Sequence, residues 1–334
     1  MKFSIFTKGL LLFDKTTFKG EEVDFSKVNF NRIRVDFKRT NFSNANLIFD
    51  ESASVGEKFI FRKCTFLHNQ ISFKSADLGQ SEIVFDESQF GGGNISFLSL
   101  TAHKLSLNNC SLSINVDARV EKCEEVHFNN AICRDLVDFN IGISSVNISL
   151  LSFYGMRNLG QVLIDWEDNS VQKMIENQKL TTTAHQKADQ YRILKESFNK
   201  LGLYDDEDKA YVQFKRNELT DQKEKYIKAK SFLGLIKYYI KKLVFDKMGL
   251  FATSPIRVFI STCFVFAFFS LLYFIISLFG GASLTCTNPD MSLLDQLFES
   301  FYFSAVTFLT IGYGECLPQG FFKTLAPVEA YCGI

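Results

Sequence analysis

Near the C-terminus the sequence reads Thr310, Ile311, Gly312, Tyr313 and Gly314, with a glycine on either side of one aromatic residue. This pattern suits cation binding. If successive carbonyls are to face one axis, alternate residues need a left-handed backbone, which glycine adopts without a steric penalty. Carbonyl oxygens arranged in this way replace the water around a dehydrated cation. We therefore predict that these five residues, here called the glycine ribbon, coordinate a cation. Thr310 would add a hydroxyl, and Ile311 and Tyr313 would point outward.

The segments before the ribbon predict elements that hold it in a membrane. Residues 258–279 contain no charged side chain. As a helix they would extend about 33 Å, enough to cross a hydrocarbon core of about 30 Å. A buried helix of a soluble protein is the alternative, but such helices rarely run so long without a polar interruption. Residues 293–309 are apolar but shorter than a span, so we expect a helix that enters the membrane and stops. Backbone exposed at that depth must be shielded by protein or line a water-filled path.

Charge distribution predicts the orientation. No Lys or Arg occurs in residues 258–322, whereas residues 221–247 carry eight lysines against three acidic residues. The positive-inside rule therefore predicts a multi-pass protein of the cell (inner) membrane with a cytoplasmic N-terminal domain. The basic stretch alone would suit a solvated helix face or nucleic-acid contact. Its mixture of lysines with Leu, Ile, Tyr and Phe, next to a span, favours a basic interfacial helix at 231–252 in contact with membrane lipid, and no nucleic acid.

The stretch TFLTIGYGE, residues 307–315, resembles the pore signature of potassium channels, whose commonest filter is Thr-Val-Gly-Tyr-Gly followed by Asp. Ile311 replaces the Val, and Glu315 keeps an acid at the filter mouth. The resemblance covers residues 256–334 and implies an outer helix at 256–279, a pore helix at 293–309, a filter at 310–314 and the start of an inner helix at 322–334.

The same resemblance implies a homotetramer with K⁺ as the permeant ion, bound at the filter only, and no cofactor. Tyr302 and Phe303 fall where the family places aromatic residues that support the filter. Leu309 stands where many members have a second Thr, so a non-selective cation channel stays open as an alternative. Only eleven residues follow Lys323, about 16 Å of helix. We therefore expect either a fragment or a product that is not a functional pore as it stands.

Eight cysteines occur without the paired spacing of a zinc site. Most are expected to be small buried residues. Cys286 and Cys316 are the exceptions, since the predicted topology places both on the outer side of the membrane. We predict a disulfide between them that joins the outer loop to the filter exit.

A repeat occupies the N-terminal part. Large apolar residues recur every twelve positions in two series offset by five, Phe61, Phe73, Phe85 and Phe97, and Phe66, Leu78 and Phe90. A fixed period indicates stacked coils with an interior column of Phe and Leu. We predict a β-solenoid over residues 16–156. Its five-residue steps resemble pentapeptide-repeat proteins, which implies a right-handed, four-sided β-helix. A β-sandwich is the alternative, although its strands are spaced irregularly.

Residues 157–230 predict a helical connector. Tyr191, Leu194 and Phe198 follow a helical course along one face, Gly202 reads as a helix stop, and the acidic pair after it would open a second helix. We expect this hairpin to pack on the end of the solenoid. The predicted fold class is mixed: a right-handed β-helix, a helical connector and an α-helical membrane pore domain. Together these parts resemble bacterial pentapeptide-repeat ion-channel proteins.

Composition excludes several functions. Basic and acidic residues number 37 each, and the predicted solenoid holds 14 basic against 17 acidic residues, which makes a poor mimic of DNA. The four histidines have no ligand spacing or catalytic motif, so an enzyme is not expected. The leading hypothesis is a potassium channel whose solenoid is a sensor or docking domain for an unknown ligand or protein. The alternative is a membrane-tethered scaffold in which the pore segment only anchors.

Overall fold

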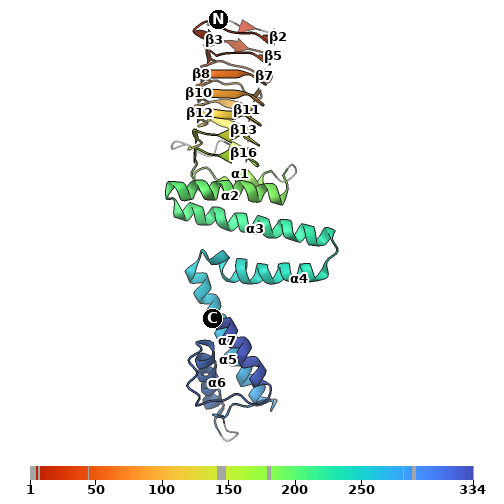
Figure 1. Cartoon of the computed structure of the whole chain (residues 1–334), viewed down its shortest axis with the longest axis vertical. Helices are drawn as coiled ribbons and strands as arrows, with labels where there is room; N and C mark the ends of the chain where they lie inside the picture. Colours follow the sequence, from red (N-terminus) through yellow and green to blue (C-terminus); the bar gives the residue numbers. More distant parts are fainter. Residues whose placement is uncertain are drawn as a thin grey trace. The chain divides into compact units, whose positions relative to one another are not determined.

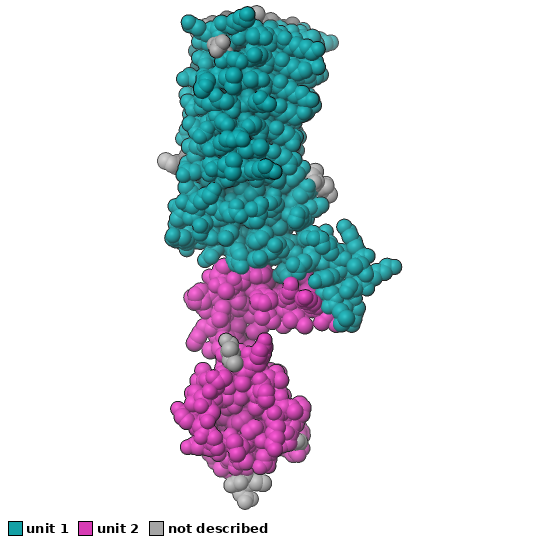
Figure 2. All heavy atoms as spheres, viewed as in Figure 1, with its two compact units in different colours: residues 1–235 teal, residues 236–334 magenta. Residues whose placement is uncertain are grey.

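A computed structural model describes residues 5–6, 8–43, 45–140, 148–178, 182–280, 282–287 and 291–333. The chain forms two compact units, Met1–Leu235 and Ile236–Ile334 (Figure 2). Their boundary falls inside helix α4 (Phe232–Lys241). The repeats therefore belong to the first unit, and the glycine ribbon belongs to the second.

Parallel strands build the first part of unit 1, where they stack one above another (Figure 1). One sheet has the order β17 (Arg157–Asn158), β14 (Ile132–Cys133), β12 (Ser111–Asp117), β10 (Gln89–Ser96), β8 (Thr65–Ser72), β6 (Asn46–Ile48) and β3 (Glu22–Asp24), with β15 (Leu136–Asp138) paired to β12 and β18 (Gln161–Leu163) paired to β15. The other has the order β16 (Ile148–Ser152), β13 (Lys122–His127), β11 (Thr101–Ser106), β9 (Glu82–Val84), β7 (Lys58–Ile60), β5 (Ile33–Asp36) and β2 (Gly9–Leu12). A short pair joins β1 (Ile5–Phe6) and β4 (Asn29–Phe30). This architecture confirms the predicted solenoid.

The strands extend past the predicted range of 16–156 at both ends. Strand β2 begins at Gly9, and β18 ends at Leu163. The repeat pattern missed the last coil because its strands β17 and β18 carry no Phe at the expected positions.

Strand register gives the length of one coil. Leu47 of β6 pairs with Val23 and with Ile71, so neighbouring coils are offset by 24 residues. Between β10 and β12 the offset is 22 where Gln89 pairs with Ser111, and 21 where Ser96 pairs with Asp117. The twelve-residue period of the sequence is therefore half a coil.

Tight turns explain that half-coil period. One series of non-glycine residues with a left-handed backbone recurs every twelve positions, each two positions after an inward Phe: Lys15, Lys27, Arg39, Glu51, Lys63, Ser75, Glu87 and Ser99. Around Lys27, the Val28 N–H donates to the Phe25 carbonyl at 3.3 Å and closes the turn. The Lys27 N–H donates to the Asp50 carbonyl of the next coil at 2.9 Å. These bonds hold a backbone conformation that L-residues otherwise disfavour.

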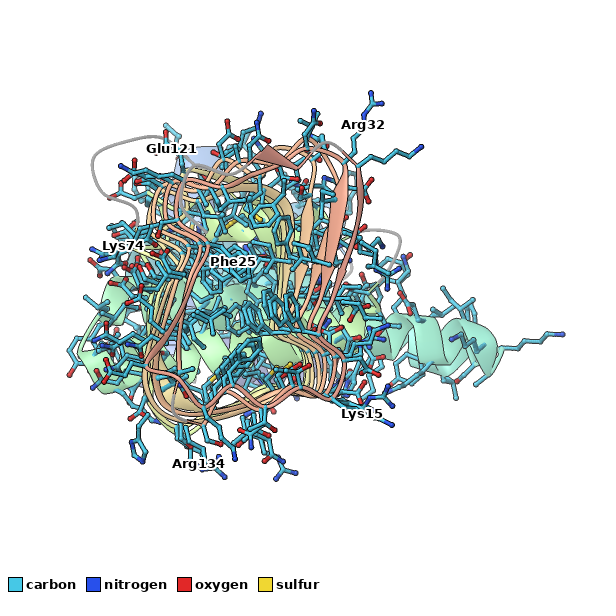
Figure 3. All side chains as sticks on the ribbon, turned by 90° about the horizontal axis from the view of Figure 1, so that it is seen from above. Lys15, Phe25, Arg32, Lys74, Glu121 and Arg134 are labelled. Carbon is cyan, nitrogen blue, oxygen red and sulfur yellow. A yellow bond between two sulfur atoms is a disulfide. The ribbon has the colours of Figure 1, made fainter. Side chains whose placement is uncertain are left out.

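The interior consists of stacked phenylalanines. Phe42, Phe66 and Phe90 lie one coil apart with ring centroids separated by 4.9 and 5.0 Å. That separation matches the distance between neighbouring strands, about 4.7–4.9 Å. In Figure 3 Phe25 lies inside the coils, whereas labelled charged residues such as Lys15 and Glu121 lie outside. The predicted interior column is therefore present.

Ion pairs connect the outer side chains of successive coils. Nζ of Lys58 lies 2.8 Å from a Glu82 carboxylate oxygen, and Lys63 and Glu87 approach to 3.2 Å. Such exposed pairs contribute little to stability individually, about 0–1 kcal/mol. Since acidic and basic groups alternate along the stack, this surface does not present the continuous negative charge of DNA.

Helices close the end of the solenoid. After α1 (Val171–Glu176) come α2 (Ala184–Leu201) and α3 (Tyr204–Lys228), joined by a turn at Gly202, whose φ is 73°. Tyr191, Leu194 and Phe198 of α2 are buried in the same core as the solenoid phenylalanines. The connector therefore continues the hydrophobic core beyond the last coil.

Polar side chains of α2 satisfy the backbone of the last coil. The Gln190 side-chain oxygen accepts the Phe153 N–H at 3.0 Å, and the Ser197 hydroxyl donates to the Val162 carbonyl at 3.0 Å. An uncovered sheet edge would leave such groups available to pair with other chains. Helix α2 thus covers the end of the solenoid and also satisfies backbone hydrogen-bonding groups of its last coil.

The predicted interfacial helix at 231–252 is wrong in one respect. It is not one α-helix, because α4 continues as a π-helix, η1 (Lys242–Met248), and then a 3₁₀ turn, η2 (Leu250–Ala252). Left-handed backbone at all three residues of η2 prevents the helix from continuing. Many apolar side chains of this stretch are exposed, including Leu233, Ile240 and Leu243.

Three further helices form the rest of unit 2. They are α5 (Pro255–Leu278), α6 (Leu293–Phe308) and α7 (Phe322–Gly333). The Ser254 hydroxyl caps α5, and Pro255 fits its first turn because that position needs no N–H donor. The predicted inner helix extends to Ile334, which lies outside the described residues.

Candidate ion-conduction site

Aromatic packing holds α5, α6 and α7 together. The ring of Tyr273 on α5 lies between Phe303 of α6 and Phe322 of α7, at centroid distances of 5.0 and 4.8 Å. Both pairs meet edge to face, a favourable arrangement for aromatic rings. This cluster, which is fully or almost fully buried, fixes the helix that leads into the glycine ribbon.

Helix α6 determines where the ribbon starts. Ser292 caps its N-terminus by accepting the Asp295 N–H at 3.2 Å, and the helix ends at Phe308. The Thr310 N–H then donates to Thr307, and the Ile311 N–H donates to Val306, each at 3.0 Å. The first two ribbon residues are therefore attached to the last helical turn.

The ribbon itself has the backbone that its sequence predicts. Gly312 and Gly314 have φ angles of 65° and 78°, in the region that favours glycine. All five ribbon residues are exposed, with Tyr313 at 68%. In the described part of the chain, the backbone groups of residues 312–314 make no hydrogen bonds. Their carbonyls are thus free to take a ligand.

A covalent link and a strand-like contact hold the ribbon's exit. Cys286 and Cys316 form a disulfide, with Cα atoms 5.1 Å apart. Beside it, Leu284 and Pro318 form an antiparallel bridge, and the Thr285 N–H donates to the Leu317 carbonyl at 3.0 Å. The segment after α5 therefore anchors the chain that leaves the ribbon.

The structure separates the two residues expected to support the filter. Tyr302 is partly exposed, and its hydroxyl lies 3.3 Å from a carboxylate oxygen of Glu315, next to the ribbon. Phe303 is buried against Tyr273. Tyr302 therefore contacts the predicted filter mouth, whereas Phe303 fixes α6 against α5.

Sequence reasoning missed two buried residues at this site. Ser304 on α6 and Glu329 on α7 are fully buried, and the Ser304 hydroxyl donates to the Glu329 carboxylate. The only signal in the sequence was a charged residue within an apolar segment, and that signal does not identify a partner 25 positions away.

One helix of the described chain is long and apolar enough to cross a membrane, α5. Large apolar side chains on it are exposed, including Phe259, Phe264 and Phe268. Exposure of that many apolar groups is unfavourable in water but favourable in lipid.

These features belong to a segment that resembles known proteins. Residues 251–334 match a family model described as an ion channel. The ion channel module, as residues 251–334 are called from here on, contains α5, α6, the glycine ribbon and α7. The match covers about a quarter of the chain. It confirms the predicted channel module at the C-terminus, and the solenoid is consistent with a pentapeptide-repeat β-helix. No curated protein and no solved structure matched the chain.

Ligand chemistry outside the ribbon is limited. Within the described ranges, the group of acidic, His or Cys side chains close enough to share a metal is Cys286, Glu299 and Cys316. Two of these are bonded to each other as a disulfide. In the solenoid, Cys64, Cys110, Cys123 and Cys133 are buried free thiols. Burial raises the pKa of Cys64 to about 12, so this thiol is unreactive near neutral pH.

Proposed function

We propose that the protein is a subunit of a homotetrameric, potassium-selective channel. The carbonyls of the glycine ribbon and the Thr310 hydroxyl would replace the hydration shell of K⁺. One observation carries the proposal: two left-handed glycines expose unbonded carbonyls inside a segment that matches the ion channel family. A single chain provides ligands on one side of an ion, so further copies around an axis are needed to surround it.

The exposure of the ribbon supports assembly. In a membrane, bare backbone is tolerated only where protein shields it or where it lines a water-filled path. Ile311 and Tyr313 are 47% and 68% exposed in the single chain. Packing of these side chains against neighbouring copies would bury them and keep the carbonyls turned toward the axis.

Local charge favours cations. Helix α6 ends at Phe308, and the carbonyl end of a helix carries partial negative charge. Glu315 follows the ribbon directly, and no Lys or Arg occurs in residues 258–322. The field near the ribbon therefore attracts cations and repels anions.

The solenoid would serve as a cytoplasmic sensor or docking domain. The lysines before α5 favour the cytoplasmic side by the positive-inside rule, and the proposed location is the cell membrane. Exposed apolar side chains along α4 and η1, together with Lys237 and Lys242, suit a segment lying in the lipid interface.

The test is ion flux through the full-length protein reconstituted in liposomes. We expect K⁺ flux that greatly exceeds Na⁺ flux, and loss of that flux in Gly312→Asp with tetramer assembly intact. Gly280→Asp is the matched control, because Gly280 has a φ of 70° and open space around it but lies outside the ribbon. Equal K⁺ and Na⁺ flux would indicate a non-selective channel. No flux from an assembled wild-type tetramer would favour the membrane-tethered scaffold.

A further inference from the structure

A buried polar contact joins α6 to α7 behind the glycine ribbon. The Ser304 hydroxyl donates to Oε1 of Glu329, and both side chains are completely buried. A buried carboxylate is costly unless it is hydrogen-bonded, because it loses its hydration. Its presence among the aromatic side chains of three helices therefore needs an explanation that apolar packing does not supply.

Ser304 differs from other buried serines of the module. The hydroxyls of Ser270 and Ser300 each donate to the carbonyl four residues earlier in their own helix, at 2.9 Å. Ser304 donates across to another helix instead. Its hydrogen bond thus restrains the position of α6 relative to α7.

A second contact lies one turn further along both helices. A Cβ on Gly333 of α7 would overlap the carbonyl oxygen of Phe308, the last residue of α6. Only glycine allows this approach. The pairs Ser304–Glu329 and Phe308–Gly333 are each spaced by four residues, so the two helices meet along one parallel line.

Helix α5 contacts the same carboxylate. The Tyr273 hydroxyl interacts electrostatically with Glu329, although neither this hydroxyl nor Oε2 of Glu329 has a hydrogen bond of standard geometry among the described residues. Glu329 is therefore the point at which all three helices of the module meet through polar groups.

We propose that Glu329 is a positioning residue that sets the geometry of the glycine ribbon through Ser304 and α6. The ribbon begins with hydrogen bonds to Val306 and Thr307, in the helical turn that Ser304 restrains. Loss of the restraint lets α6 tilt, and the ribbon carbonyls move with it. The proposal rests on the proposed function, since it explains how the ion ligands are held in place.

Four variants of the full-length protein test this proposal, with the ratio of K⁺ to Na⁺ permeability in liposomes as the readout. Glu329→Ala and Ser304→Ala should each lower the ratio about tenfold, which corresponds to about 1.4 kcal/mol, the worth of one hydrogen bond. Glu329→Gln keeps an oxygen that accepts the Ser304 hydroxyl and should stay within about twofold of wild type. Ser300→Ala, a serine of equal burial on the same helix, is the matched control and should also stay within that range.

A double variant and a second readout complete the test. Combining Ser304→Ala with Glu329→Ala should lower the ratio no further than Glu329→Ala alone, because both remove one interaction. Hydrogen exchange of the Thr310 and Ile311 amides should accelerate in both single variants but not in Ser300→Ala. An unchanged ratio and unchanged exchange in Glu329→Ala would overturn the proposal. A ratio in Glu329→Gln as low as in Glu329→Ala would also overturn it, since the charge would then act directly. If the wild type conducts no ions, the proposed function fails, and hydrogen exchange alone decides whether Glu329 positions the ribbon.

Discussion

Left-handed backbone occurs in both units, but different residues occupy it. In the solenoid it falls on Lys, Arg, Glu and Ser, at positions that repeat every twelve residues. In the glycine ribbon it falls on Thr310 and on two glycines, Gly312 and Gly314. The steric cost is similar in both places, about 1–2 kcal/mol for a residue with a Cβ, so the surroundings must account for the difference.

In the solenoid, a side chain at such a turn points into solvent and gains a partner. Lys27 contacts Glu51 at 3.4 Å, and Lys63 contacts Glu87 at 3.2 Å, each one coil away. At the ribbon, a side chain on Gly312 or Gly314 would have to fit where further copies of the chain are expected to meet. The solenoid tolerates strain because its neighbours are present in every chain. At Gly312 and Gly314 glycine avoids the strain, and the neighbours expected there are other chains.

The largest predicted effect tests how far the solenoid depends on its repeats. Phe66 is completely buried between Phe42 and Phe90. We expect Phe66→Ala to lower the free energy of unfolding by about 3–5 kcal/mol, because it leaves a cavity in the stack. The measurement is denaturant unfolding of the full-length protein in detergent, followed through the β-sheet signal.

Leu67 provides the control for that substitution. It is the next residue of β8, but its side chain faces outward and is 41% exposed. We expect Leu67→Ala to cost less than about 1 kcal/mol, since it removes little buried surface. Equal losses in the two variants would show that the Phe stack is not the main source of stability.

The second-largest predicted effect concerns the disulfide of the ion channel module. The disulfide between Cys286 and Cys316 closes a segment of the chain with a sequence separation of 30. We expect Cys286→Ser to destabilise the module by about 2–4 kcal/mol, mainly because the unfolded chain becomes less constrained. The measurement is thermal unfolding followed through the helical signal, with Cys263→Ser, a free cysteine, as control. A non-reducing peptide map that shows both cysteines free would contradict the premise.

The two units also differ in how much of them the sequence predicts. The period of Phe61, Phe73 and Phe85 was sufficient to predict stacked coils, because a repeated position has the same environment in each coil. The coil length of 24 residues was not predicted, since one coil contains two similar turns and the sequence does not show which Phe residues stack. Phe61 stacks on Phe85, not on Phe73, which meets it edge to face.

In the ion channel module, local motifs predicted the local structure. The glycines of the ribbon and the apolar run of α5 can each be recognised from a short stretch of sequence. The contact between Ser304 and Glu329 could not be found in this way, because it joins single residues of two helices and nothing repeats. The same holds for Gly333, whose need for a small side chain depends on the backbone of Phe308.

A smaller effect tests the strain at the solenoid turns directly. Ser75 has a φ of 52° and no ion-pair partner among the described residues. We expect Ser75→Gly to raise the free energy of unfolding by about 0.5–1 kcal/mol, because glycine removes the steric cost of this conformation. Ser113→Gly is the matched control, since Ser113 lies in the extended strand β12. For Ser113→Gly we expect the free energy of unfolding to fall by a similar amount. A lower free energy of unfolding in both variants would mean that the turns are not strained.

The smallest effect is a pH dependence that belongs to the solenoid. Burial lowers the pKa of His127 below 6.5, and the Glu125 carboxylate 3.0 Å away partly opposes this shift. The folded state therefore favours the neutral ring. The contribution of His127 to the free energy of unfolding is fully present above pH 6.5 and decreases as the pH falls from 6.5 toward the pKa of the folded state. We expect His127→Gln to flatten this part of the stability profile between pH 7 and 5, whereas His185→Gln, at a ring 77% exposed, leaves it unchanged. A profile that is identical in wild type and His127→Gln would assign the pH dependence between pH 7 and 5 to other groups. Asp14 is not among them, because Arg39 lowers its pKa and its contribution is lost only at more acidic pH.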